Sequence, residues 1–268
     1  MPSVSRLGTI IADEDMRIVV LGSGTSVPHR ARNSAGFWVQ TDELRLLLDC
    51  GAGVLHAMPR YGLDWVNITH VFLTHFHLDH IAELPALLFA LKHSPGVEQR
   101  TAPLRIMGPV GTARLLKMWE EAVGYELLTL RFPVEIEDVE PGREYVLLPG
   151  HWMRLHKTPH TSESLAVRVD ERGTSVGYTG DTAYADDLAE FFHHLDLLIA
   201  ECSFAKPRAD VRHMSIPEVA QLARRAKVAR LVATHLYPEL DALDVKTEIA
   251  KIFPGSVIIA YDGLSLDI

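Results

Sequence analysis

The segment from Thr74 to His80 reads T-H-F-H-L-D-H and follows the apolar run V-F-L. It holds His75 and His77 two residues apart, with Asp79 next to His80 behind them. Residues two apart on an extended chain lie on one face, and a turn into a helix can return the later pair to the same place. A catalytic zinc usually takes about three protein ligands, so four in one segment predict two metal ions. A run of exposed loop histidines is the alternative.

Short apolar runs must position these side chains. Each run is rich in β-branched residues and ends at a polar cluster; the runs cover residues 17–25, 44–51, 70–77, 174–182, 195–203 and 229–236. Such runs predict buried strands with functional groups at their carboxyl ends. The runs V-F-L-T-H and L-V-A-T-H look alike, which suggests two related halves that face one another.

Helices are expected between these strands. Residues 82–92 follow the histidine motif, residues 112–123 end before a glycine, and residues 216–226 carry a proline in their first turn. Residues 132–150 alternate like strands joined by a Pro-Gly turn. Strands and helices that interleave in this way predict a layered α/β fold with the helices outside the sheets.

Composition narrows the class of protein. With 268 residues, 47% of them hydrophobic, the chain can bury a large core, and we expect one domain over residues 1–268. It has neither an apolar run of the roughly 18 residues that span a membrane nor a signal peptide, so we expect a soluble, cytoplasmic protein without membrane contacts. Cys50 and Cys202 lack a C-x-x-C partner and are expected to be buried free thiols.

Charge and histidine content bear on the partners. The formal net charge of -9 disfavours an extended nucleic-acid surface, although it leaves room for a small phosphate site. The chain carries 14 histidines, several at the ends of apolar runs, and imidazole is the commonest metal ligand in proteins. A metal site is therefore favoured over nucleic-acid coating.

The segment H-F-H-L-D-H matches the H-x-H-x-D-H signature of the metallo-β-lactamase superfamily, so the chain resembles that superfamily. The resemblance implies a four-layer αββα sandwich, in which two mixed sheets are flanked by helices. It also implies a later histidine, an aspartate in a G-D-[ST] turn and a final histidine after a strand. Asp181 lies in G-D-T, and His235 in L-V-A-T-H fits the final position.

The later histidine has three candidates in G-H-W-M-R-L-H-K-T-P-H, namely His151, His156 and His160. We choose His160 because H-T-S-E-S-L-A-V-R-V resembles the ribonuclease Z pattern, in which a serine follows the histidine by four residues and a strand comes next. Ser164 fits that serine. His151 and His156 are better explained as strand or loop residues, and each remains an alternative ligand.

Other segments resemble the ribonuclease Z branch. G-S-G-T-S-V-P, N-S-A-G-F and L-L-L-D-C-G-A-G resemble its N-terminal segments, and A-E-C-S-F with H-M-S resembles its glutamate and histidine pair, here Glu201 and His213. Members that process tRNA usually carry an inserted basic arm, but the corresponding interval here holds compact, acidic sequence. The resemblance thus favours an arm-less type, comparable with the phosphodiesterase of phosphonate breakdown, which opens a cyclic ribose phosphate.

The resemblance implies two metal sites that share one aspartate. The first would consist of His75, His77 and His160, the second of Asp79, His80 and His235, with Asp181 as the bridge. Nitrogen and oxygen ligands suit two zinc ions, and also Mn²⁺ or Fe²⁺. A hydroxide bridging two such ions would attack the substrate.

Three residues are expected to take part in catalysis, Asp79, His213 and Glu201. His213 would protonate or stabilise the leaving group, and Glu201 would orient its imidazole. The alternative is that His213 is a surface loop residue and Glu201 a buried, ion-paired carboxylate.

The leading hypothesis is therefore a binuclear metal-dependent phosphodiesterase that acts on a small phosphodiester or an RNA end. One alternative is a lactonase, thioesterase or β-lactamase, for which a tyrosine near the metals would be expected; another is a tRNA 3′-processing endoribonuclease. A flavodiiron protein is disfavoured because His77 stands where that branch has glutamate, and a pure binding role because all seven ligands are present. Relatives often dimerise, which leaves room for a homodimer.

Overall fold

Apolar side chains alternate between two faces along the buried strands. In the computed structural model, which describes residues 16–268, Ile18 and Val20 of β1 (Arg17–Gly22) pack into one buried cluster, and Val19 and Leu21 into another. Successive side chains of a strand point to opposite faces, so such a strand is covered by protein on both sides. β1 therefore lies inside a layered structure.

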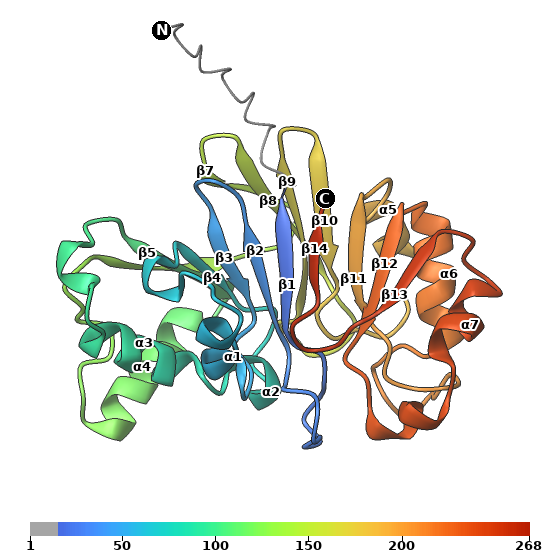
Figure 1. The fold of residues 1–268 in the computed structure, drawn as a ribbon, viewed down its shortest axis with the longest axis horizontal. Coiled ribbons are helices and arrows are strands. Elements are labelled where there is room, and N and C mark those ends of the chain that lie inside the picture. The colour runs from blue at the N-terminus through green and yellow to red at the C-terminus, as the bar shows by residue number, and fades with distance from the viewer. Residues whose placement is uncertain (1–15) are drawn as a thin grey trace, which may run out of the picture.

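The strands within residues 16–268 form two seven-stranded mixed sheets (Figure 1). The first has the order β14-β1-β2-β3-β4-β5-β6 and contains, besides β1, the strands β2 (Gly36–Gln40), β3 (Arg45–Leu48), β4 (His70–Phe72), β5 (Leu104–Pro109), β6 (Val134–Val139) and β14 (Ser265–Asp267). The second has the order β13-β12-β11-β10-β9-β8-β7 and contains β7 (Glu144–Leu148), β8 (His151–Lys157), β9 (Leu165–Glu171), β10 (Thr174–Tyr178), β11 (Leu197–Glu201), β12 (Arg230–Thr234) and β13 (Ser256–Ile259).

Helices cover the outer face of each sheet. Those over the first sheet are α1 (Val54–Arg60), α3 (Leu84–His93) and α4 (Thr112–Val123), with the single turn α2 (Leu78–Ile81) before α3. Those over the second are α5 (Asp186–Phe191), α6 (Ile216–Ala226) and α7 (Val245–Ala250). The remaining helical turns are Trp65–Asn67, Val97–Gln99 and Pro238–Ala242. The predicted four-layer αββα arrangement is confirmed, and no helix within residues 16–268 is long and apolar enough to cross a membrane.

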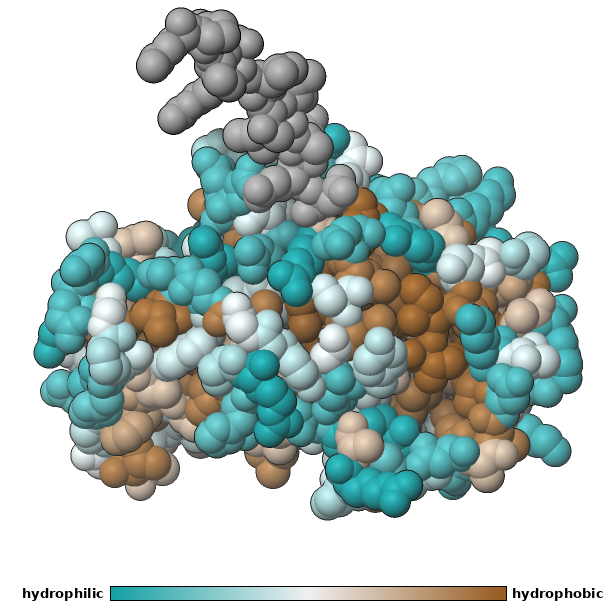
Figure 2. All heavy atoms as spheres, viewed as in Figure 1, coloured by the Kyte–Doolittle hydropathy of each residue, from teal (hydrophilic) through white to brown (hydrophobic). Residues whose placement is uncertain are grey.

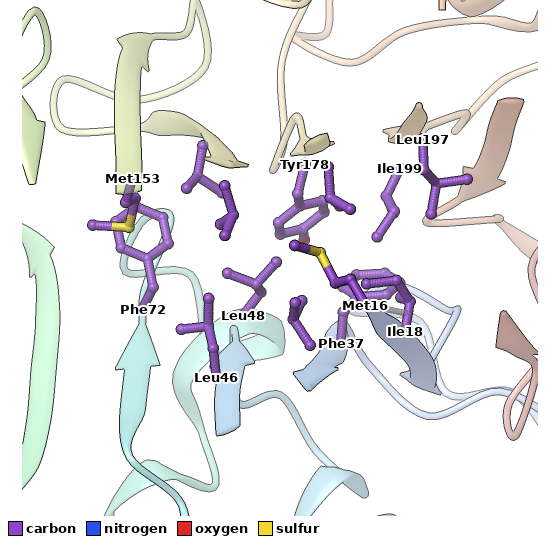
Figure 3. Packing of buried hydrophobic residues seen from close by; sticks show 14 of the residues in the cluster. Met16, Ile18, Phe37, Leu46, Leu48, Phe72, Met153, Tyr178, Leu197 and Ile199 are labelled. Atoms are coloured by element: carbon purple, nitrogen blue, oxygen red, sulfur yellow. The ribbon is translucent and has the colours of Figure 1, made fainter. Parts of the chain in front are cut away.

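The sheets meet across a continuous apolar layer (Figure 3). Phe37 of β2 and Tyr178 of β10 come from opposite sheets, and their ring centroids are 4.8 Å apart. Leu48 of β3 belongs to the same cluster, whereas the free thiols Cys50 and Cys202 are buried in the two outer clusters, as expected. Burying large side chains in this layer holds the two sheets face to face.

The two sheets repeat one pairing pattern. From β1 to β6, successive neighbours pair antiparallel, antiparallel, parallel, parallel and parallel, and the series from β8 to β13 is the same. By position, β3 corresponds to β10 and β4 to β11. The similar runs V-F-L-T-H and L-V-A-T-H belong to β4 and β12, which are not equivalent, so their likeness does not mark related positions.

One side of the sandwich stays partly open. β13 and β14 are outer strands of their sheets, and Ile258 and Leu266 are only partly buried against the central layer. Figure 2 shows apolar surface gathered over this region, between largely hydrophilic helix faces. The candidate site lies elsewhere, at the ends of the central strands.

The buried imidazole of His70 on β4 makes folding stability depend on pH. Burial, helped by the charge of Arg105, lowers the pKa of His70 to about 4. The unfolded chain binds this proton more strongly, so stability is lost as the pH falls from about 6.5 towards about 4. His70→Asn should therefore reduce the loss of unfolding free energy between pH 7.5 and pH 5 by about 1 to 2 kcal/mol, measured by urea denaturation. The exposed His56 supplies the control, because His56→Asn should leave that loss unchanged. An equal loss in wild type and His70→Asn would contradict the prediction.

Candidate metal centre

The carboxyl ends of parallel strands from both sheets meet at one place. β4 leads into His75, β10 into Asp181, β11 ends at Glu201 and β12 leads into His235. Each of these four side chains is buried. Since the carboxyl ends of neighbouring parallel strands lie at the same edge of a sheet, residues distant in sequence converge there.

A single helical turn brings the rest of the histidine motif into this place. After β4 the chain turns at His77 into α2, which places Asp79 and His80 beside the strand ends. The backbone of His80 accepts a hydrogen bond from Cys50 N at 2.6 Å. Gly51 is required here, because a Cβ at this position would lie 2.0 Å from the carbonyl oxygen of Asp79. The helix expected over residues 82–92 corresponds to α3, and α2 is a separate turn before it.

All seven predicted ligands come together in two groups, and within each group the ligand atoms lie within 4.8 Å of one another. The first group is His75, His77, His160 and Asp181, and the second is Asp79, His80, Asp181 and His235. Both groups match the division expected for two ions that share an aspartate.

Asp181 faces both groups with different oxygens. Its Oδ2 lies 3.7 Å from His75 Nε2 and 3.6 Å from His160 Nε2. Its Oδ1 lies 3.3 Å from His80 Nε2 and 3.4 Å from His235 Nε2. One carboxylate between two sets of imidazoles has the geometry of a bridging ligand.

Unpaired polar atoms at the centre of both groups fit metal ions. Among the described residues, the buried Nε2 atoms of His75, His80 and His235 and the Oδ1 of Asp181 have no hydrogen-bond partner. Leaving such an atom unpaired costs about 1–3 kcal/mol, so native proteins rarely do so. Burial also lowers the pKa of His75 well below its ordinary value, which keeps the imidazole neutral, the form that binds metals. The donor set therefore suits divalent cations.

The other ring nitrogens have fixed partners. His75 Nδ1 lies 3.0 Å from Thr74 Oγ1, and His235 Nδ1 lies 3.0 Å from Ser203 Oγ. His160 Nδ1 donates to the carbonyl of Arg212 at 2.9 Å, and the Arg212 guanidinium donates to the carbonyl of His160 at 2.8 Å. A partner on Nδ1 sets the tautomer and leaves Nε2 free for a metal.

Asp49, the residue after β3, was not assigned a role from the sequence. It is fully buried with a positive φ of 59°, and accepts hydrogen bonds from Thr74 N at 2.8 Å, His80 Nδ1 at 2.7 Å and Tyr178 Oη at 2.9 Å. Asp49 thereby orients His80 and ties the motif to the opposite sheet. The available signal was an acidic residue directly after the apolar run L-L-L.

Glu201 and His213 form the predicted pair. His213 Nδ1 lies 3.0 Å from Glu201 Oε1, and the Glu201 carboxylate also accepts from Thr182 N at 2.5 Å and Ser203 Oγ at 2.7 Å. Burial opposes protonation of His213, but its hydrogen bond and charge interaction with Glu201 raise the pKa of His213 to about 9. His213 lines the same cavity as Asp181, so its Nε2 can face a bound molecule.

The two alternative histidines lie outside both groups. His151 pairs with Glu171 at 2.8 Å, and His156 pairs with Asp187 at 3.1 Å. Both belong to β8. Their contacts explain them as strand residues, which leaves His160 as the histidine that joins the first group.

A cavity of about 600 Å³ opens over the two groups. Besides predicted ligands and His213, it is lined by Ser26, Ser34, Ala52, Leu78, Ala82 and Tyr237. These lining residues include no lysine or arginine. Positive charge at the floor would therefore come from bound cations and from His213.

Sequence comparison identifies a family and named relatives. The family model described as a beta-lactamase superfamily domain matches residues 44–236. The ribonuclease Z of Mycobacterium bovis (strain BCG / Pasteur 1173P2) is 30% identical over 246 residues, which cover 84% of this chain and 87% of that protein. The ribonuclease Z of Haloferax volcanii is 27% identical over 309 residues, which cover 94% of this chain and 95% of that protein.

Solved structures share the fold. The metallo-beta-lactamase fold protein YhfI from Bacillus subtilis is 27% identical with a TM-score of 0.81, covering 95% of this chain and all of that one. Human short-form tRNase Z has a TM-score of 0.78 at 23% identity, covering 94% and 99% of the two chains, and is evidence for the fold alone. The chain thus belongs to the beta-lactamase superfamily, whose fold implies divalent metal ions, and is a metal-dependent hydrolase of the ribonuclease Z-like branch.

Proposed function

We propose that this chain is a phosphodiesterase with two divalent metal ions, zinc by preference. The observation that carries the proposal is Asp181, whose two carboxylate oxygens face two separate groups of imidazoles. The chemistry of these nitrogen and oxygen donors suits zinc. His75, His77 and His160 would hold one ion, and the second group would hold the other.

The ligand set supports an anionic substrate. When bound, two such ions lower the pKa of water so that it can attack at neutral pH, and they neutralise charge on a phosphodiester. The imidazoles bring no negative charge, so Asp79 and Asp181 are the acidic ligands in the two groups. Two divalent ions therefore leave the centre with a net positive charge, which attracts an anionic phosphodiester.

His213 and Glu201 support phosphodiester cleavage over ester or amide hydrolysis. An alkoxide leaving group needs a proton, and His213, which lines the cavity and contacts Glu201, would donate it. The names of the curated relatives point the same way, because a ribonuclease cleaves phosphodiester bonds. Asp79, whose Oδ2 lies 3.5 Å from His235 Nε2, would act in catalysis as a ligand.

The cavity supports a small phosphodiester or a single RNA end as the substrate. Its volume of about 600 Å³ and its lining without lysine or arginine would accept a nucleotide-sized molecule rather than a long nucleic acid. The acidic strand β6 (V-E-I-E-D-V) stands in the interval where a basic arm would be inserted. Processing of tRNA remains the alternative, favoured by the relatives' names.

A substrate panel tests the reaction class. The zinc-loaded protein should hydrolyse bis-p-nitrophenyl phosphate and a 2′,3′-cyclic nucleotide faster than an acyl lactone or nitrocefin, measured as kcat/KM. The reason is that two bound metal ions would attract and stabilise an anionic ester. Hydrolysis of the lactone alone would contradict the proposal and favour a carboxylic-ester hydrolase.

Removing the shared carboxylate should lower the metal content of the centre. Asp181→Ala should bind fewer than two ions per chain by elemental analysis and lower turnover of bis-p-nitrophenyl phosphate roughly 100-fold. Asp187→Ala, which removes an exposed carboxylate outside both groups, is the matched control and should keep both metal content and turnover. Two ions retained in Asp181→Ala would show the bridging assignment to be wrong.

Replacing His213 should separate metal binding from proton transfer. His213→Ala should keep both ions and lower kcat by about 10²- to 10⁴-fold for diesters with alkoxide leaving groups, because these need a proton. A diester with a nitrophenolate leaving group should lose far less. Equal losses for both kinds of leaving group, or loss of metal, would count against this role.

A further inference from the structure

One wall of the cavity is formed by an aromatic ring that stacks on a second aromatic ring. Tyr237 follows the predicted ligand His235 by two residues and lines the cavity. Phe204 stacks behind it, with ring centroids 5.2 Å apart and an interplanar angle of 24°. The guanidinium carbon of Arg208 lies 4.5 Å from the centroid of Phe204. Of these three side chains, only Tyr237 lines the cavity.

Another part of the cavity wall is apolar, beside the two serines Ser26 and Ser34. Leu78, which stands between two predicted ligands, is 71% exposed and lines the cavity together with Ala52 and Ala82. Exposing a leucine to water is unfavourable, and covering it with an apolar group releases that cost. A molecule that fills the cavity can therefore gain by placing an apolar part against Leu78.

The aromatic wall lies at a defined distance from the centre. The ring centroid of Tyr237 is 5.9 Å from that of His235 and 6.4 Å from that of His213. The backbone N of Leu236 donates to the carbonyl of Ser23 at 3.1 Å, which fixes the segment that carries the ring. A planar group stacked on the ring of Tyr237 could thus be joined through a sugar ring to a phosphate at the metal centre.

We propose that Tyr237 is a specificity-determining residue, whose ring, backed by Phe204, binds a nucleobase of the substrate. This inference rests on the proposed phosphodiesterase function and narrows its substrate to nucleoside phosphodiesters. Every base has a flat face, so stacking tolerates any base, and its loss typically weakens binding by on the order of 10-fold. A free cyclic nucleotide and the terminal nucleotide of an RNA both supply this chemistry.

Equilibrium binding tests the ring without turnover. Zinc-loaded wild type should bind adenosine 5′-monophosphate about 10-fold more tightly than ribose 5-phosphate in isothermal titration calorimetry. Tyr237→Leu should remove that difference without changing the affinity for ribose 5-phosphate, and Tyr237→Phe should keep it. Tyr184→Leu is the matched control, since the Tyr184 hydroxyl accepts hydrogen bonds from Gln221 and Arg225 and does not line the cavity.

Three outcomes of the binding experiment would overturn the proposal. The first is a wild type that binds the two ligands equally or fails to bind adenosine 5′-monophosphate. The second is a Tyr237→Leu variant that keeps the difference or weakens both ligands alike. The third is a Tyr237→Phe variant as weak as Tyr237→Leu, which would assign the effect to the hydroxyl group.

Turnover then separates this inference from the proposed function. Tyr237→Leu should raise KM about 10-fold for adenosine 2′,3′-cyclic phosphate and for the dinucleotide ApA, but not for the base-free methyl riboside 2′,3′-cyclic phosphate. A higher kcat/KM of the wild type for the cyclic phosphate would identify a free nucleotide as the substrate. A higher kcat/KM for ApA would identify an RNA end. If wild type cleaves no diester, the proposed function fails, whereas the binding result still decides the role of Tyr237. If it cleaves all three and the variant changes none, only this inference fails.

Discussion

The arrangement depends on polar atoms that are buried without partners. The Nε2 atoms of His75, His80 and His235 converge with one oxygen of Asp181 beneath the cavity, each of them buried. Such atoms repel or lose solvation unless a cation joins them, so the fold must force them together. Two features do so: apolar layers on both faces of each sheet, and hydrogen bonds on the opposite ring nitrogens.

The repeated sheet topology explains how both halves contribute. Asp49 comes directly after β3 and Asp181 three residues after the equivalent strand β10, so the chain beyond corresponding strands supplies a buried carboxylate in each sheet. Their surroundings make them different. Asp49 is surrounded by hydrogen-bond donors and orients His80, whereas Asp181 keeps one oxygen unpaired towards the imidazoles. Asp49 therefore has a structural role, whereas Asp181 has an oxygen that can accept a cation.

Local spacing accounts for what could be predicted from the sequence. H-x-H-x-D-H is a contiguous signal, and the layered α/β fold follows from buried apolar runs. The four layers, Asp181 and His235 were expected because of the family resemblance that this motif carries. Asp49, Ser203 and Tyr237 are different, because their roles arise only from which strand ends are neighbours. The likeness of two T-H runs was misleading for the same reason. The close approach of Gly51 to the carbonyl of Asp79 is a tertiary contact that no periodicity reveals.

The two hydrogen bonds between His160 and Arg212 restrict how the loops around the site can move. His160 lies in the loop after β8, and Arg212 immediately precedes His213 in the segment between β11 and α6. The two hydrogen bonds, each from a side chain to a backbone carbonyl, hold these two segments together. Any movement that withdraws His160 must therefore drag the neighbour of His213 with it. The positions of His160 and His213 are thus coupled, so a loop movement that displaces one of them also displaces the other.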